Sequence, residues 1–170
     1  GSLKFRLNKL DESEKMFDSA VVFANQANYK WLATHSFVRL SFIKISTNNY
    51  SDSLNYCNSA LKLAMETNDL YNLVRIYYSL SYNYKCLKRF DLSLKFSEKN
   101  FELIKKTKSD LMQLWDTFDS TAGALYESEF FETASIFQKE ALHFSEVSND
   151  KFAQHLSKVY LGIIYTKANK

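Results

Sequence analysis

The most restrictive feature of this sequence is a pattern that returns every 40 to 41 residues, anchored on Tyr50, Phe90 and Phe131. Each anchor is followed three residues later by a small residue and ten residues later by Ala or Asn. The same spacing fits a fourth anchor at Leu10. The stretches after the three aromatic anchors end on the pairs Asn68-Asp69, Ser109-Asp110 and Asn149-Asp150. Since apolar residues three and four apart mark one face of an α-helix, every copy predicts an amphipathic helix.

A second helical pattern precedes each aromatic anchor and closes the chain. Its residues are Phe37, Leu40 and Ser41, then Tyr77, Leu80, Ser81 and Tyr84, then Phe118, Thr121, Ala122 and Leu125, and finally Leu161, Gly162 and Tyr165. The chain therefore consists of helix pairs. The predicted helices cover residues 10–28, 31–47, 50–67, 70–88, 90–107, 110–128, 130–148 and 151–168.

Composition supports an all-α fold of one domain. The 170 residues include no Pro and three Gly, residues on which hairpins and tight turns depend. With 46% hydrophobic and 16% aromatic residues, the chain can bury a core and is not disordered.

These residues resemble the tetratricopeptide repeat, whose units pair two helices through aromatic and small residues at fixed positions. The residues that match are Tyr77, Leu80, Ser81, Tyr84 and Phe90, together with Phe131, Ala134, Ala141, Leu161, Gly162 and Tyr165. The resemblance implies a right-handed α-solenoid of stacked antiparallel helix pairs over residues 1–170, with about eight helices. Its units would be 1–29 (partial), 30–69, 70–110, 111–150 and 151–170 (partial), and we expect the chain to be a fragment of a larger protein.

Three departures from the family pattern matter. The usual unit has about 34 residues, so the units here allow longer helices. The Pro that commonly ends the second helix is absent, and we expect Asp69, Asp110 and Asp150 to set that corner by accepting backbone N–H groups. Lys44 stands where the other units have Tyr84, Leu125 and Tyr165, which predicts different packing in that unit.

The resemblance also implies where a partner binds, because such arrays use the concave surface lined by their first helices. The predicted binding residues are His35, Arg39, Phe42, Arg75, Tyr78, Tyr82, Lys85, Asp116, Asp119 and Tyr126. Val38, Ile45, Gly123, Val159 and Ile163 share these faces. Cations lie toward one end and carboxylates toward the other, which favours a peptide of opposite polarity with an apolar anchor.

Some members of the family hold a C-terminal carboxylate with a Lys/Asn/Arg clamp. At the corresponding positions this chain has Val38, Phe42, Tyr78 and Tyr82. The clamp is missing, so binding to chaperone tails is disfavoured. The longer units are similar to those of scaffold and peptide-receptor members, in which the array senses a peptide or transmits a signal to an attached domain.

Charge and cysteine content exclude several functions. The net charge of +3 is small and interspersed, so we expect no direct nucleic-acid binding. There is no run of 18 apolar residues, so we expect no membrane insertion. Cys57 and Cys86 lack metal-site spacing, and we expect Cys57 to be a buried thiol in a reducing, cytoplasmic compartment. Cys86, followed by Lys88 and Arg89, is the better candidate for a reactive thiol.

We find no constellation that predicts catalysis. The nucleotide, metalloprotease, hydrolase and calcium-loop motifs are absent. Ser41-x-x-Lys44 and Ser59-x-x-Lys62 match a motif of serine acyltransferases, but its companion SDN and KTG motifs are missing. His35, His143 and His155 have no companion ligands at metal-site spacing. We therefore expect no catalytic residue, metal or cofactor.

Two hypotheses remain open. The first is a non-catalytic module that binds a protein or peptide segment, as the sensory or scaffold part of a larger regulatory protein. The alternative is a structural scaffold that self-associates into a homo-oligomer through its terminal helices.

Overall fold

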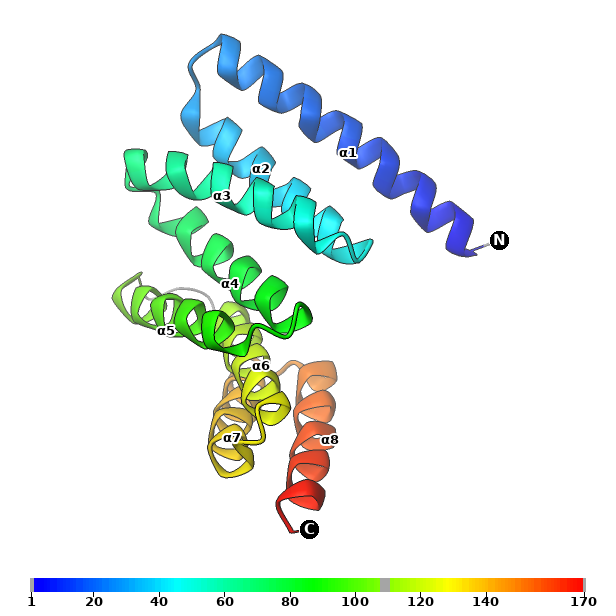
Figure 1. The fold of residues 1–170 in the computed structure, drawn as a ribbon, viewed down its shortest axis with the longest axis vertical. Helices are drawn as coiled ribbons and strands as arrows, with labels where there is room; N and C mark the ends of the chain where they lie inside the picture. Colours follow the sequence, from blue (N-terminus) through cyan, green and yellow to red (C-terminus); the bar gives the residue numbers. More distant parts are fainter. Residues whose placement is uncertain (1, 108–110, 170) are drawn as a thin grey trace. The chain divides into compact units, whose positions relative to one another are not determined.

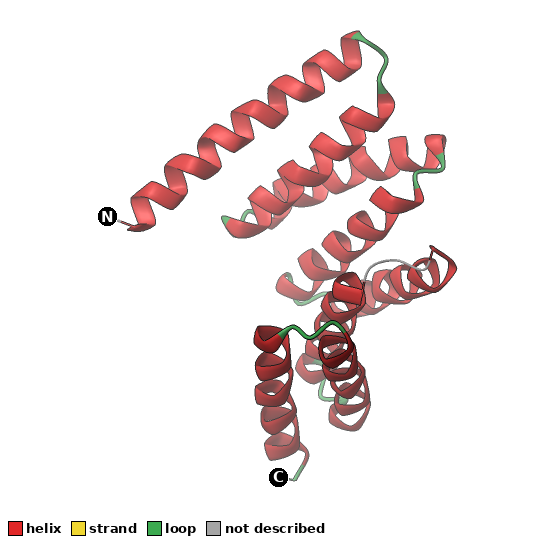
Figure 2. Cartoon of the chain, turned by 180° about the vertical axis from the view of Figure 1, so that it is seen from behind, coloured by secondary structure: helices red, strands yellow, loops and turns green. Residues whose placement is uncertain are grey.

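The computed structural model describes the backbone of residues 2–107 and 111–169 and the side chains of residues 9–104, 106 and 115–169. These residues form eight α-helices in sequence order and contain no strand (Figures 1 and 2). The helices are α1 (Ser2–Gln26), α2 (Lys30–Ser46), α3 (Tyr50–Thr67), α4 (Leu70–Cys86), α5 (Phe90–Thr107), α6 (Leu111–Glu127), α7 (Phe131–Val147) and α8 (Lys151–Ala168).

The predicted all-α array of consecutive helices is confirmed. Helices that follow one another in the chain pack against one another, as α1 does with α2, α2 with α3, α5 with α6, α6 with α7 and α7 with α8. The bounds of α3, α5 and α8 are those that the sequence predicts. Helix α1 starts at Ser2 rather than at residue 10. Leu, Lys and Arg predominate in this early segment, and these residues favour a helix even without the repeat pattern.

The turns explain how the chain manages without Gly and Pro. Each turn among the described residues contains one residue in the left-handed conformation: Asn28, Asn48, Asn68, Lys88, Glu129 or Asn149. In the first turn the Tyr29 amide donates to the Ala24 carbonyl at 2.7 Å, and the Asn28 amide donates to the Asn25 carbonyl at 3.2 Å. This is the Schellman motif, and the same pair of bonds closes the other five turns. Asn tolerates this conformation better than other residues with a side chain, and it replaces Gly in four of the six turns.

In three of these turns the side chain of the residue that ends the turn also caps the next helix. The Asp69 carboxylate accepts the Asn72 amide at 3.1 Å, and the Asp150 carboxylate accepts the Ala153 amide at 3.0 Å. The predicted capping role is therefore confirmed for these two residues, whereas Asp110 lies outside the described residues. Asn49 accepts the Asp52 amide at 3.2 Å in the same way.

Contacts divide the chain into two compact units, residues 1–79 and 80–170, with the boundary inside α4. Each helix pair of a repeat array contacts only its neighbours, so such an array has no single central core. That the whole chain is one repeat domain remains a prediction. We describe unit 1 (residues 1–79) and unit 2 (residues 80–170) separately.

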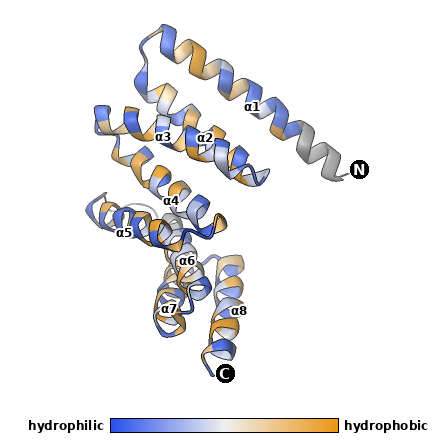
Figure 3. Cartoon of the chain, in the orientation of Figure 1, coloured by the Kyte–Doolittle hydropathy of each residue, from blue (hydrophilic) through white to orange (hydrophobic). Residues whose placement is uncertain are grey.

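Small residues and hydroxyl groups fill the contact between helices in unit 1. The Ser53 hydroxyl donates to the Ser41 carbonyl at 3.0 Å, and the Ser41 and Ser79 hydroxyls lie 3.1 Å apart. Ala60 is fully buried on the same face of α3 as Ser53. Short side chains allow close approach, and the paired hydroxyls avoid the cost of burying unsatisfied polar groups. Hydrophobic and hydrophilic residues are mixed along the helices, as in helices that bury one face and expose the other (Figure 3).

The unusual lysine of unit 1 is ion-paired. Lys44 on α2 forms a salt bridge with Glu14 on α1, and both side chains are partly buried. The hydrogen bond that Lys44 donates to Glu14 raises the pKa of Lys44. An ion pair thus occupies a position that carries Tyr84, Leu125 or Tyr165 in the other units.

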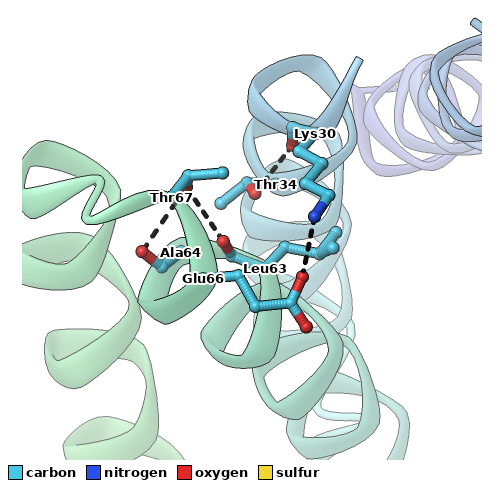
Figure 4. A network of polar contacts seen from close by, with 6 residues as sticks. All are labelled: Lys30, Thr34, Leu63, Ala64, Glu66 and Thr67. Atoms are coloured by element: carbon cyan, nitrogen blue, oxygen red, sulfur yellow. Dashed lines mark hydrogen bonds and ion pairs between the residues drawn. The ribbon is translucent and has the colours of Figure 1, made fainter. Parts of the chain in front are cut away.

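Polar contacts that are more exposed to solvent lie at the N-terminal end of α2 and the C-terminal end of α3 (Figure 4). The Lys30 ammonium lies 3.2 Å from Glu66, and Thr34 and Thr67 each donate to a carbonyl of their own helix. A solvent-exposed pair of this kind contributes little to stability.

The core of unit 2 is more aromatic. Trp115, Phe118, Ala141 and Ala153 form one buried cluster, and Phe101, Phe137, Phe144 and Leu156 pack around it. Ser81 lies beneath α5, where its hydroxyl is 2.7 Å from Ser97. The predicted burial of Leu80 and Ala141 is confirmed, since both side chains are essentially inaccessible.

Candidate partner-binding surfaces

In unit 1, five of the predicted binding residues come together on α2 and α4. These are His35, Arg39, Phe42, Arg75 and Tyr78, and we call them the arginine cluster. The Arg39 Nε donates to His35 Nε2 at 3.3 Å. The Arg75 guanidinium lies 5.8 Å from the centre of the Phe42 ring, and the Phe42 and Tyr78 ring centres are 6.2 Å apart. All five side chains are half-buried, so they are held in place and yet reachable.

The arginine cluster has an excess of positive charge. Burial, then Arg39, then Arg75 lower the pKa of His35, while Asn72 and Asp69 act in the opposite direction. Among the described residues, no carboxylate lies within ion-pairing distance of either arginine. His35 is therefore mainly neutral at pH 7, and the two guanidinium groups carry the charge of the cluster.

Unit 2 contains a cleft of about 440 Å³. Its walls come from the C-terminal end of α4, the turn and first residue of α5, and the helices α6, α7 and α8. The lining residues are Lys85, Cys86, Lys88, Phe90, Asp119, Ala122, Gly123, Tyr126, Glu127, Gln138, Tyr160, Ile163 and Ile164. Clefts of this size with a mainly apolar wall and a few charges are typical of binding sites.

Two carboxylates, Asp116 and Asp119, lie one turn apart on α6 near the cleft. Burial, and to a lesser extent the neighbouring Asp119, raise the pKa of Asp116 to about 6. Burial also raises the pKa of Asp119, although Gln138 donates to its Oδ1 at 2.8 Å and Lys85 stabilises its charged form. Asp119 lines the cleft, whereas Asp116 does not.

The Lys85 side chain lies along the cleft wall between Tyr82 and Gly123. Its Nζ lies 4.8 Å from the centre of the Tyr82 ring, within the range of a cation–π interaction. A Cβ added at Gly123 would lie 3.2 Å from the same Nζ. The lack of a side chain at Gly123 thus leaves room for the lysine head group.

The structure groups most of the predicted residues, but not all of them. Lys85, Asp119 and Tyr126 line the cleft with Gly123 and Ile163, and Tyr82 lies beside Lys85. Asp116 is next to Asp119, and Val159 is exposed on α8 outside the cleft lining. Val38 corrects the sequence interpretation: it is 1% exposed and belongs to the core, because its short side chain points between the helices rather than to a surface. Whether any of these residues binds a partner remains a prediction.

The sequence interpretation missed several cleft residues, of which Tyr160 is the most informative. Tyr160 is 40 residues after Ser120, which follows Ser79 by 41, and Ser79 follows the predicted binding residue Arg39 by 40. Ser79 and Ser120 are buried, so the repeat register pointed to packing at this position rather than to a surface. Gln138 comes from a second helix, a class that the resemblance assigns to packing, so no sequence signal pointed to it.

The predicted burial of Cys57 is confirmed. Cys57 is buried among Ser41, Ser53 and Ser79, and burial raises the pKa of its thiol despite hydrogen bonds from these residues. Such a thiol is poorly nucleophilic. Cys86 is half-buried and lines the cleft.

The two SxxK matches have ordinary structural contacts. Ser41 is buried and donates to the Val38 carbonyl at 2.8 Å, while Lys44 is paired with Glu14. Ser59 is exposed and donates to the Asn55 carbonyl at 3.1 Å.

Within the described part of the chain, no three His, Cys, Asp or Glu side chains are placed to share a metal ion. No helix there combines the length and apolar character needed to span a bilayer.

Fold and surfaces together define a helical-repeat protein with half-buried polar and aromatic residues on its first helices. No protein-family model matches the sequence, and none of the curated proteins matches it. Among solved structures, BtubC (BKLC) from P. vanneervenii has a similar fold, with a TM-score of 0.77 and 18% identity. The match covers 94% of this chain and 66% of the BtubC chain, so this chain spans slightly less than two thirds of it. At this identity the likeness shows the fold alone.

Proposed function

We propose that this chain is a non-catalytic, tetratricopeptide-like binding module that holds a segment of another protein on first helices of its repeats. The observation that carries the proposal is the cleft of unit 2. Three first helices contribute to it, through Lys85, Gly123, Tyr126 and Ile163 among others. Repeat arrays bind partners on the surface made by successive repeats. The module would act as a sensor or scaffold within a larger regulatory protein.

The chemistry of the cleft favours an apolar anchor with charged neighbours. A volume of about 440 Å³ accommodates one or two large side chains against Phe90, Tyr126 and Ile163. Lys85 and Lys88 on one wall and Asp119 and Glu127 on another would orient polar groups of the segment. Burial of the anchor would supply most of the affinity, and the charges would supply specificity.

Peptide display against the folded protein tests this proposal. Segments selected by the parent protein should bind the Tyr160→Ala, Ile163→Ala double variant at least tenfold more weakly, about 1.4 kcal/mol. Phe152→Ala is the matched control, because Phe152 is a large apolar residue of the same helix that is 74% exposed and does not line the cleft. Selected segments that bind the double variant as tightly as the parent would show that the cleft is not the binding site.

One observation favours self-association as a second candidate function. Met16 and Phe23 on α1 are 73% and 69% exposed. Tyr56 and Leu63 of α3, 40 residues later, are their equivalents in the next repeat. Tyr56 packs against Phe37 of the preceding helix, with ring centres 6.1 Å apart. The equivalent face of α1 is uncovered, and a second copy could cover it. Sedimentation over a concentration range should then show association that Met16→Lys with Phe23→Lys abolishes.

A further inference from the structure

We propose that Arg39 and Arg75 of the arginine cluster form an anion subsite that takes a side-chain carboxylate of an acidic polypeptide segment. The inference rests on the proposed function, because it names the chemistry of the partner. It concerns unit 1 alone and does not depend on the cleft of unit 2.

The first argument is that the two arginines lack a counterion. Arg39 bonds to His35, and the Arg75 Nη1 donates to the Tyr71 hydroxyl at 2.8 Å. The carboxylate that acts on His35 is that of Asp69, the residue before α4, and Asn72 donates to both of its oxygens, at 3.1 and 2.7 Å. The Nε of Arg75 is buried without a hydrogen-bond partner. Unpaired donors of this kind are costly in a folded protein unless a ligand satisfies them.

The second argument is that two aromatic rings hold the Arg75 guanidinium, and only one of its donors, Nη1, is used by them, in the bond to the Tyr71 hydroxyl. Arg75 lies over Phe42 at 5.8 Å and over Tyr71 at 5.6 Å. Contacts with ring faces fix the plane of the guanidinium and leave its edge N–H groups to point elsewhere. The edge of a guanidinium matches the two oxygens of a carboxylate.

The third argument concerns which anion fits. Phe42 and Tyr78 flank the arginines and form an apolar border, so a carboxylate on a short apolar stem suits the surroundings. His35 adds no charge when neutral, so the site presents two positive charges, which suit one or two carboxylates of a peptide. A phosphoryl group is the competing ligand, and the experiment below distinguishes it.

Trp31 provides a built-in reporter. Its ring stacks on His35 with a centre distance of 5.3 Å and an interplanar angle of 14°. The second tryptophan, Trp115, is buried in unit 2 and far less accessible to a ligand. A ligand at Arg39 and Arg75 should change Trp31 fluorescence, and Trp31→Phe should remove the change. Binding should also raise the pKa of His35, because the anion offsets the field of the arginines.

The experiment uses three probes: a capped hexaglutamate peptide, its hexaglutamine analogue and inorganic phosphate. Hexaglutamate should change Trp31 fluorescence and raise the pKa of His35 in an NMR titration, and hexaglutamine should do neither. Arg39→Gln and Arg75→Gln should each weaken hexaglutamate binding at least tenfold. Arg89→Gln is the matched control, because Arg89 is an exposed arginine in a turn of unit 2. Circular dichroism should show that all three variants keep the parent fold.

Equal binding of hexaglutamine, or full binding by the arginine variants, overturns the subsite. Saturable binding of phosphate without binding of hexaglutamate also overturns it, in favour of a phosphoryl ligand. If display selects segments that need Tyr160 and Ile163 while hexaglutamate fails to bind, the proposed function stands and the subsite falls. If hexaglutamate binds through Arg39 and Arg75 while display selects nothing, the proposed function fails and the subsite remains as an anion site.

Discussion

At the scale of single residues, the left-handed asparagines control where each helix ends. Asn68 has a φ of 52°, and its amide and that of Asp69 close the turn after α3. Asn68→Ala should cost about 1–2 kcal/mol, because Cβ makes this conformation unfavourable and Ala cannot offset it. Asn68→Gly should cost much less. Urea midpoints of the two variants measure the difference, with Asn58→Ala on the exposed face of α3 as control. Equal losses for Ala and Gly would mean that the Asn68 side chain, not its conformation, matters.

Replacing a buried residue by a smaller or by a larger one should lower the free energy of unfolding. Leu80 and Ala141 are 1% and 0% exposed. Leu80→Ala should cost about 2–5 kcal/mol through lost burial and a cavity. Ala141→Phe should cost about 1–3 kcal/mol by overpacking the aromatic cluster of unit 2. Leu87→Ala, at an exposed leucine in a turn, is the control. Midpoints unchanged from the parent would contradict the repeat register.

Asp116 should make stability depend on pH. Its folded-state pKa of about 6 lies above the ordinary aspartate pKa of 3.8, so the folded state binds the proton more tightly than the unfolded state. The contribution of Asp116 to stability is therefore full below pH 4 and is lost as the pH rises through 6. Asp116→Asn removes this loss, so the variant should gain stability relative to the parent between pH 4 and 7. Urea midpoints at both pH values test this, and a constant difference between the two proteins would show that the carboxyl is not perturbed.

At the scale of a helix, α4 shows how one element can serve packing and recognition on different faces. Leu80 and Ser81 are buried, whereas Tyr78 and Tyr82, four residues apart, are half-buried. Residues at this spacing share one face of a helix. Tyr78 lies near Phe42, and Tyr82 lies beneath the Lys85 ammonium. The face that carries the two tyrosines is therefore less covered than the opposite face, where Leu80 is buried.

The Tyr78→Ala, Tyr82→Ala double variant tests that face. It should keep its fold and lose little stability, yet bind a selected segment at least tenfold more weakly, about 1.4 kcal/mol. Binding by the parent should weaken with salt, because acidic residues of the segment would meet Arg75 and Lys85. Unfolding or aggregation of the variant would show that the tyrosines are core residues. Unchanged binding would place recognition on another surface.

At the scale of the whole molecule, the fold depends on packing between neighbouring helices rather than on cross-links. Cys57 and Cys86 are both free thiols in the structure. Treatment with a chelator and a reductant should therefore leave the helical circular dichroism and the urea midpoint unchanged. Loss of either signal would indicate a metal or disulfide requirement, and the histidines would then be the first residues to replace.

The order and bounds of the helices could be predicted because their causes are local. Helical periodicity, the asparagines of the turns and the caps at Asp69 and Asp150 act over a few residues, so they are legible in a single sequence. The repeat pattern did not show that α1 extends back to Ser2, because that segment lacks the anchor residues and only its helix propensity indicates a helix.

What only the tertiary structure decided is which side chains their neighbours cover. Periodicity places Val38 and Phe42 on the same face of one helix, but packing against other helices buries Val38 and leaves Phe42 half-exposed. The pairing of Lys44 with Glu14, the unpaired state of Arg39 and Arg75, and the cleft position of Tyr160 likewise depend on distant residues. A helix face is a local property of the chain. Burial, counterions and cavities depend on the lengths of side chains that other helices bring, so the sequence alone determined the array, and its tertiary packing decided the surfaces that could bind a partner.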